Sequence, residues 1–311
     1  MEKQKKYFKI NLFLILMGVV FIFGLSYINR NYVNENNKFL RVPNNLKLIN
    51  LGSSHGLYGI KYPPEINAFN FSVSSQPFYY DLKILKKNIS KIQENGVVLI
   101  PISIFSFYQG NKIEELNDNY YTFLDANEVY LGDSRKSFTI KYFSLFYNSK
   151  EIIPVAKYLL TSLKNKTFKP QPLKWPRNLS LNEKINEAEK TTKRHLGIDD
   201  LNCSQPPDIS FGYLSNILEF CLKNNLKPVL ITTPQSYLYN ERITKINYEK
   251  RIYSHIKKLN EIFKFDYLDY SHDNRFINNL NLFSDDDHLN EKGAEIFTEI
   301  LLNDLKLKSI L

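Results

Sequence analysis

Two short polar motifs, one near each end of the chain, carry residues that could act together as a nucleophile and its base. The first is Leu-Gly-Ser-Ser-His-Gly at residues 51–56, and the second is Ser-Asp-Asp-Asp-His-Leu-Asn at residues 284–290. Serine is a poor nucleophile at neutral pH and needs a base within hydrogen-bond reach. Asp285 can orient His288 three residues later and leave its other ring nitrogen free as the base. These residue types predict acyl transfer, with Ser54 as the nucleophile.

Each motif also has a simpler interpretation. Glycine and serine favour tight turns, so residues 51–56 could be only a turn capped by serine hydroxyls. Three consecutive aspartates before a histidine, at residues 285–287, are also compatible with a divalent-cation site. The motifs support each other, because one ends the first predicted strand and the other precedes the last predicted helix. We therefore expect a catalytic serine, and neither a metal nor an organic cofactor.

Other polar residues near the motifs are secondary candidates. His55 directly follows Ser54, and neighbouring side chains usually point apart, so we expect it to line the pocket rather than act as the base. Gln76 lies close to the same predicted edge of the sheet and could contact substrate. The remaining histidines have no acidic or serine context in the sequence and are interpreted as surface or packing residues: His195, His255 and His272.

Apolar runs that alternate with helical patterns must position these motifs. The predicted strands cover residues 46–51, 68–71, 97–102, 228–232 and 265–268, and the predicted helices cover 78–94, 213–223, 246–263 and 291–305. Alternation of helices with continuously apolar strands predicts a parallel sheet covered on both faces, which is a three-layer α/β/α sandwich. In such sheets the site lies beyond the carboxyl ends of the strands, where the first motif falls.

Residues 105–205 interrupt this alternation. They are rich in aromatic residues, and residues 152–163 have a helical pattern. We interpret them as a largely helical insertion between the third and fourth strands, which covers the site or shapes a substrate groove. Aromatic rings suit sugar binding, although such rings more often pack in a core of their own.

The N-terminus predicts a membrane anchor. Residues 10–28 are nearly all apolar, and nineteen residues of helix span about 28 Å, enough to cross a hydrocarbon core. A lysine cluster lies in residues 1–9, so by the positive-inside rule this tail stays cytoplasmic and the rest of the chain lies outside. A cleaved signal peptide would have a shorter apolar region that ends in small residues, so we favour an uncleaved anchor in the cell membrane. Residues 29–45 predict a linker to a globular domain over residues 46–311.

Charge and cysteine content exclude few functions. The net charge is +9, but the lysines are scattered and no nucleic-acid motif accompanies them, so we expect no nucleic-acid partner. The two cysteines, Cys203 and Cys221, are too few for a disulfide framework or a zinc site. A single bridge between them and a buried free thiol at Cys221 both remain open.

The order of the motifs resembles that of the SGNH/GDSL hydrolase superfamily, over residues 46–102 and 226–305. The first block of that family, Gly-Asp-Ser, matches Gly52-Ser53-Ser54, which favours Ser54 over Ser53 as the nucleophile. Its last block, Asp-x-x-His, matches Asp285 and His288. The resemblance therefore implies the same three roles that the residue types suggest.

The two middle blocks of the family depart from its pattern here. The second block, Asn-x-Gly-x-x-Gly, begins at Asn70 and has Ser72 and Ser75 in place of both glycines. The third block, Gly-x-Asn-Asp, should follow the strand at residues 97–102, where Ser103 lies and asparagine is absent. The resemblance then implies an oxyanion hole made by the Ser54 N–H, with Asn70, Ser75 or Ser103 as further donors.

Members with a membrane anchor and altered middle blocks are similar to proteins that modify surface polymers, such as the alginate O-acetylation proteins and the teichoic-acid D-alanylation protein of the DltD type. The resemblance implies an extracytoplasmic serine O-acyltransferase that acts on a cell-surface polysaccharide, with a membrane-bound O-acyltransferase as a partner. The same residues would serve a carbohydrate esterase. The altered blocks also leave open a non-catalytic assembly or glycan-binding protein on the same scaffold.

Overall fold

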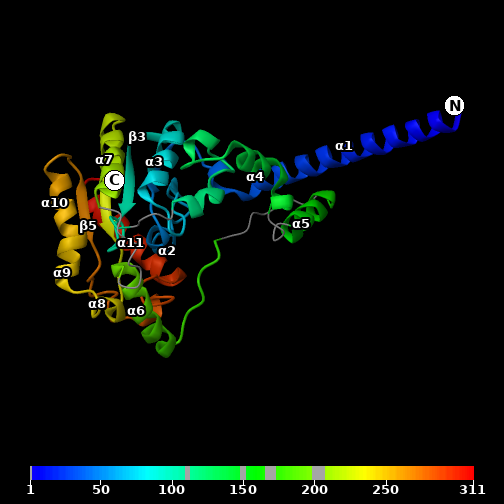
Figure 1. The fold of residues 1–311 in the computed structure, drawn as a ribbon. Helices are drawn as coiled ribbons and strands as arrows, with labels where there is room; N and C mark the ends of the chain where they lie inside the picture. Colours follow the sequence, from blue (N-terminus) through cyan, green and yellow to red (C-terminus); the bar gives the residue numbers. More distant parts are fainter. Residues whose placement is uncertain (1, 109–112, 148–151, 165–172, 198–206) are drawn as a thin grey trace. The chain divides into compact units, whose positions relative to one another are not determined.

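Two parts of the chain fold into separate compact units. The computed structural model describes residues 2–108, 113–147, 152–164, 173–197 and 207–311 (Figure 1). The larger unit combines Val42–Ile113 with Lys174–Leu311, and the smaller unit combines Met1–Arg41 with Glu114–Leu173. Both polar motifs lie in the larger unit.

A five-stranded parallel sheet forms the centre of the larger unit, in the order β2-β1-β3-β4-β5. Its strands are β1 (Leu46–Asn50), β2 (Ala68–Asn70), β3 (Ile92–Pro101), β4 (Lys227–Thr232) and β5 (Asp266–Asp269). The order reverses direction between β1 and β3. In open parallel sheets this reversal opens a crevice at the carboxyl ends of the strands, where ligands bind.

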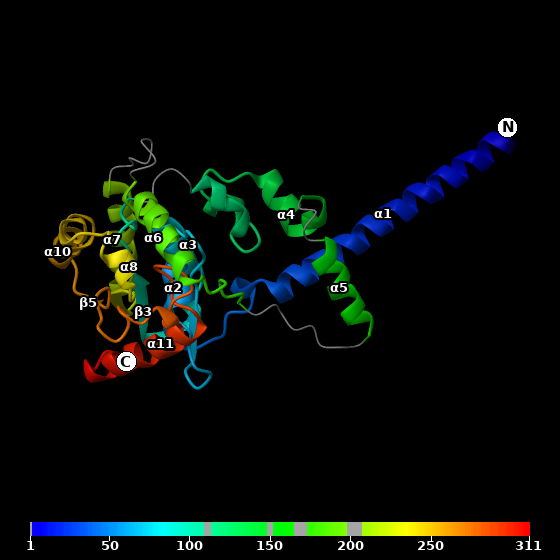
Figure 2. The same cartoon turned by 90° about the horizontal axis from the view of Figure 1, so that it is seen from below.

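Helices cover both faces of this sheet. On one face α3 (Phe78–Lys87) packs beside α7 (Pro207–Lys223), and on the other α2 (Ser54–Gly59) packs beside α11 (Glu291–Leu307). Figure 2 shows α3 and α7 on one side of β3 and α11 on the other. Alternate residues of the strands, with Phe297 and Leu301 of α11, form a fully buried core. The predicted three-layer α/β/α sandwich with a parallel sheet is therefore confirmed.

Three predicted helices differ from the structure. The helix expected over residues 213–223 begins earlier, as α7 at Pro207. The helix expected over residues 78–94 ends at Lys87, because the Asn88 side chain donates to the Ile84 carbonyl and the chain then turns into β3. The helix expected over residues 246–263 is divided into α9 (Lys245–Tyr248) and α10 (Ser254–Asn260) by a π-helical turn. This turn brings residues five apart to one side, where the rings of Tyr248 and Tyr253 lie 6.1 Å apart.

The smaller unit is helical and includes α1 (Glu2–Asn36), α4 (Ser134–Tyr147) and α5 (Ile152–Leu163). Within the described residues, α1 is the helix that is long and apolar enough to cross a membrane, a property that an N-terminal signal sequence shares. It continues beyond residue 28, so the first part of the expected linker is helical. Tyr32 of α1 packs against Tyr158 of α5, with ring centroids 5.8 Å apart.

Several aromatic residues of the expected insertion are packed internally. Tyr120, Tyr121 and Phe123 are all buried in the smaller unit. The later part of the same segment belongs to the larger unit and forms α6 (Leu181–Leu196). Cys203 lies outside the described residues, and Cys221 is a buried free thiol on α7.

Candidate active site

Ser54 lies at the carboxyl end of β1, as the first residue of α2. In the preceding turn Gly52 has a φ angle of +109°, which residues with a side chain rarely adopt, and a Cβ there would lie 3.1 Å from the Pro101 ring. The Gly52 N–H donates to the buried carboxyl of Asp81 at 2.8 Å. The turn therefore holds Ser54 in the crevice where the strand order reverses.

His288 and Asp285 lie in a loop that closes on itself before α11. The Ser284 N–H donates to the His288 carbonyl at 2.8 Å, and the Asp285 Oδ1 accepts from the His288 N–H at 2.7 Å. The other carboxylate oxygen, Asp285 Oδ2, lies 2.9 Å from His288 Nδ1. Asn290 ends the loop, since its side chain caps α11. Backbone and side-chain contacts thus fix the imidazole relative to Asp285.

The two motifs meet at the His288 ring, where Nε2 lies 2.8 Å from Ser54 Oγ. A continuous chain of polar contacts then runs from the Ser54 hydroxyl through the imidazole to Asp285. Ser54 is half-buried, and 16% of the His288 side chain is exposed, so the reacting atoms remain accessible. An imidazole that donates Nδ1–H to a carboxylate leaves Nε2 to accept the serine proton, which is what general-base catalysis needs.

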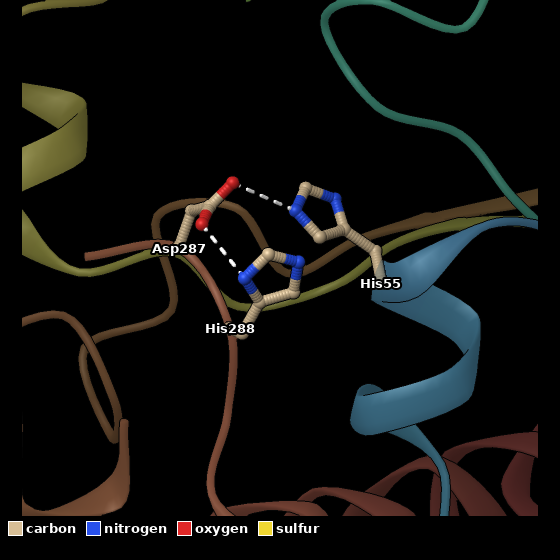
Figure 3. A group of neighbouring side chains, drawn as sticks. All are labelled: His55, Asp287 and His288. Atoms are coloured by element: carbon tan, nitrogen blue, oxygen red, sulfur yellow. Dashed lines mark hydrogen bonds and ion pairs between the residues drawn. The ribbon is translucent and has the colours of Figure 1, made fainter. Parts of the chain in front are cut away.

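A second imidazole, that of His55, lies beside His288, with the two ring centroids 5.0 Å apart. The buried Asp287 carboxylate contacts both rings, with Oδ1 3.0 Å from His288 Nδ1 and Oδ2 3.0 Å from His55 Nε2 (Figure 3). His55 Nδ1 in turn lies 2.5 Å from the Ser103 hydroxyl. His55 therefore turns toward the site, and the His288 Nδ1–H faces two carboxylates, those of Asp285 and Asp287.

The charges around His288 favour its protonated form. Burial alone disfavours that form, but the charge of Asp287 and hydrogen bonds to Asp285 and Asp287 outweigh it and raise the pKa of His288 well above its usual value. Burial and the neighbouring aspartates raise the pKa of Asp286 to about 8, and burial lowers the pKa of His195 to about 3. At neutral pH these two groups are uncharged, so Asp285 and Asp287 set the field at His288.

The same groups include a set of atoms that could hold a cation. One nitrogen each of His55 and His288 and an oxygen of Asp287 lie within 4.8 Å of one another, as do oxygens of the three aspartates. Each imidazole nitrogen, however, faces a carboxylate at hydrogen-bond distance. A cation would take the Nδ1 lone pair of His288 and keep its proton on Nε2, which removes the acceptor for the Ser54 proton. The two chemistries exclude each other, and the serine contact on Nε2 favours the proton network.

Two of the expected oxyanion or substrate residues build the turn behind Ser54. The Asn70 amide donates to the carbonyls of Gly56 and Ile60, both at 3.0 Å, and so holds α2 against β2. Gln76 is buried and donates to Asp81 at 2.6 Å. These amides therefore support the position of Ser54.

The other two expected donors, Ser75 and Ser103, differ in exposure. Ser75 is exposed in the loop after β2 and has a φ angle of +61°. Ser103 is buried after β3, with its N–H donating to Ser106 and its hydroxyl contacting His55. The Ser103 hydroxyl is thus part of the imidazole network rather than of the exposed surface.

Residues that the sequence did not single out complete the site. Asp287 is distinguished in sequence only by its place immediately before His288, since all three aspartates have the same type. His195, expected at the surface or in packing, lies with Nδ1 3.6 Å from Asp287 Oδ2. His195 reaches Asp287 because α6 packs near the site. No local sequence pattern indicates where α6 packs.

Lys184 links α6 to the loop that contains Asp285 and His288. Lys184 is buried, and its ammonium donates to the carbonyls of Leu280 and Phe283 at 2.8 and 2.7 Å. A second link joins the segment before α6 to the same loop, because the Leu179 N–H donates to the Ser284 carbonyl at 2.7 Å. The helix and the segment before it therefore support the loop through three backbone carbonyls.

Aromatic rings lead from His288 to an open groove. The Tyr58 ring lies 5.8 Å from the His288 ring and 5.8 Å from the Trp175 ring. Trp175 lines a groove of about 640 Å³. The remaining lining is mostly polar and consists of Pro176, Asn178, Asn281, Asn290, Glu291, Lys292 and Glu295.

Comparisons with known proteins show little similarity. No family model matches the chain, and none of the curated proteins matches it. One similar solved structure is a candidate acylhydrolase from Bacteroides fragilis, with 10% identity and a TM-score of 0.38, covering 91% of this chain and 98% of the other. Another is a candidate platelet activating factor from Streptococcus pneumoniae, with 10% identity and a TM-score of 0.40, covering 95% and 99%. At these values the similarities carry no conclusion about activity.

Proposed function

We propose that this chain is an SGNH-like acyl-transfer enzyme with Ser54 as nucleophile, His288 as general base and Asp285 as the residue that orients the base. The observation that carries the proposal is the contact chain from Ser54 Oγ to His288 Nε2 at 2.8 Å and from His288 Nδ1 to Asp285 at 2.9 Å. A turn, a buried strand end and a closed loop all hold these three side chains in place.

The proposed reaction has two steps. Ser54 Oγ attacks the carbonyl carbon of an acyl ester or thioester, while His288 Nε2 takes the serine proton and then gives it to the leaving alcohol or thiol. A hydroxyl group of the acceptor then attacks the acyl-serine, and His288 takes its proton and returns it to Ser54. The N–H of Ser54, as the first residue of a helix, is free of an intrahelical acceptor and supplies one donor to the carbonyl oxygen.

We propose a polysaccharide as the acceptor. The Trp175 ring begins the groove beside Tyr58 and His288, and amide and carboxylate groups line the remainder. A flat aromatic face with hydrogen-bonding groups around it is the chemistry that binds sugar rings. The apolar helix α1 supports a location at the outer face of the cell membrane, with residues 1–9 in the cytoplasm. The resemblance implies a membrane-bound O-acyltransferase as the partner that supplies the acyl group.

Covalent labelling of the full-length protein in detergent tests the catalytic assignment. We expect a serine-directed fluorophosphonate to label Ser54 and a chromogenic acetyl ester to be cleaved, with both activities lost in Ser54→Ala and His288→Ala. Ser53→Ala is the matched control, because Ser53 is adjacent and its side chain makes no cap hydrogen bond. Equal labelling of the Ser54→Ala variant and the wild type would place the nucleophile at another residue and refute the assignment of Ser54. Absence of labelling and of ester cleavage in the wild type would refute the proposal and favour a non-catalytic glycan-binding protein.

Product analysis separates transfer from hydrolysis, since a carbohydrate esterase would use the same three residues. The acyl-serine enzyme is mixed with polysaccharide fragments, and mass spectrometry measures the acylated fragment against free acid. We expect acylated fragment to dominate in the wild type and to fall in Trp175→Ala, in which labelling of Ser54 persists. Free acid alone would identify an esterase.

A further inference from the structure

Asp287 is not one of the three residues proposed for catalysis, yet its carboxylate contacts the base of that set. It contacts the rings of both His288 and His55, 3.0 Å from a nitrogen of each (Figure 3). Only 2% of its side chain is exposed, against 21% for Asp285. A buried carboxylate acts on a neighbouring charge more strongly than one that water screens, so Asp287 contributes at least as much to the field at His288 as the better-aligned Asp285.

We propose that Asp287 and His55 are positioning residues for His288, in which Asp287 accepts the His288 Nδ1–H beside Asp285 and His55 holds Asp287 in that place. The proposal rests on the proposed function, because it concerns the base of the same reaction. It adds a second carboxylate and a second imidazole to the three residues proposed for catalysis.

The hydrogen bonds of this network form a consistent set. If His55 carries its proton on Nε2, it donates to Asp287, and its Nδ1 accepts from the Ser103 hydroxyl. His55 and Ser103 are 3% exposed each, so neither reaches a substrate, and Ser103 is not a second nucleophile. A buried carboxylate needs such donors, because an unpaired charge in the interior is costly. The hydrogen bond from His55 therefore reduces the cost of burying the Asp287 charge next to His288.

Other titratable groups around the network leave this assignment unchanged. His195 faces Asp287 at 3.6 Å and hydrogen-bonds the Tyr239 hydroxyl, and burial keeps it neutral at neutral pH. Asp286 is buried beside Asp287 and is protonated at neutral pH. Lys184 interacts with Asp285 from α6, while its ammonium donates to backbone carbonyls. Among these buried groups, Asp287 therefore provides the negative charge that acts on His288.

The protonation of His288 in the full-length protein, read by NMR of ¹³C-labelled histidine, tests the role of Asp287. Removal of one of two carboxylates must lower the pKa of His288, so Asp287→Asn is expected to shift its titration to lower pH by about one unit or more. The acid limb of kcat/KM should move in the same direction, and kcat should fall about 10- to 100-fold at unchanged KM. Asp273→Asn, which removes a carboxylate paired with Arg275, is the control and should change neither. An unchanged His288 titration in Asp287→Asn would overturn the proposal.

Two variants at His55 test its own role and remain informative if Asp287→Asn does not fold. His55→Leu removes the donor to Asp287 and should lower kcat about tenfold or more, whereas His55→Gln keeps an N–H near the same point and should restore most of it. Equal kcat values in wild type, His55→Leu and His55→Gln would refute the role of His55. If the wild type fails to label at Ser54, the proposed function fails, and the NMR titration still decides whether Asp287 acts on His288.

Discussion

Removal of the Lys184 ammonium should loosen the loop that carries the base while leaving the sheet intact. Lys184→Met keeps most of the side-chain volume but removes the donor to the carbonyls of Leu280 and Phe283. Those carbonyls lie at the start of the loop that continues to Asp285 and His288. The variant therefore tests whether α6 holds the site together.

The size of the effect follows from two hydrogen bonds of a charged donor. Each contributes about 1.5–3 kcal/mol, and the cost of burying the ammonium opposes the sum. That cost is present, since burial lowers the pKa of Lys184. We expect a net loss of about 2–4 kcal/mol, which corresponds to a roughly 30- to 1000-fold larger population of the locally open loop.

Hydrogen exchange measured by mass spectrometry on peptides that cover residues 280–290 reads this opening directly. The Ser284 and His288 amides, which are bonded within the loop, should lose protection, and the labelling rate of Ser54 should fall with them. Lys190→Met is the matched control, because Lys190 lies on the same helix with 72% of its side chain exposed. If Lys184→Met and Lys190→Met exchange and label alike, α6 does not support the loop.

Three further results are expected. Because two carboxylates raise the pKa of His288, the labelling rate of Ser54 should increase with pH and reach half its maximum above about pH 6.5, the ordinary histidine value; a lower midpoint contradicts the charge arrangement. Burial raises the pKa of Asp81 from 3.8 to about 7, so the folded state binds this proton more tightly than the unfolded chain. The stability that this proton contributes is fully present below about pH 4 and is lost as the pH rises through about 7. The melting temperature of the wild type, compared with that of Asp81→Asn at the same pH, should therefore fall between these two pH values. A difference in melting temperature that stays constant with pH would refute this prediction. Burial raises the pKa of the Cys221 thiol to about 12, so in Cys203→Ser iodoacetamide should react only after unfolding; rapid reaction of the folded protein would show an accessible thiol.

Local patterns were sufficient for most of the fold. Parallel strands buried on both faces are apolar throughout, so Val97–Ile100 and Val229–Ile231 could be recognised without knowledge of their partners. Helix ends were less predictable. Residues after Asn88 continue an apolar spacing that suits a helix, but pairing with β1 draws Ile92 into a strand.

Some residues of the candidate site could also be predicted from local patterns, and others could not. Ser54, Asp285 and His288 belong to two motifs whose chemistry is visible in a few consecutive residues. The contact between His55 and Asp287 joins residues 232 positions apart, and it depends on how α2 and the loop before α11 approach each other. His55 was expected to line a pocket because sequence neighbours usually point apart. In the first turn of α2 the direction of its side chain is instead set by tertiary contacts to Ser103 and Asp287.

The separation of Ser54 from His288 by 234 positions also orders the events of biosynthesis. A ribosome that adds about 5–20 residues per second needs roughly 10–50 s to go from one to the other, so the growing chain carries its serine long before any base exists to activate it. Products that terminate before His288 lack this loop, and the proposed function predicts that their Ser54 is not activated. Under the proposed function, acyl transfer by Ser54 therefore becomes possible only after the loop that contains His288 has been made and has met α2.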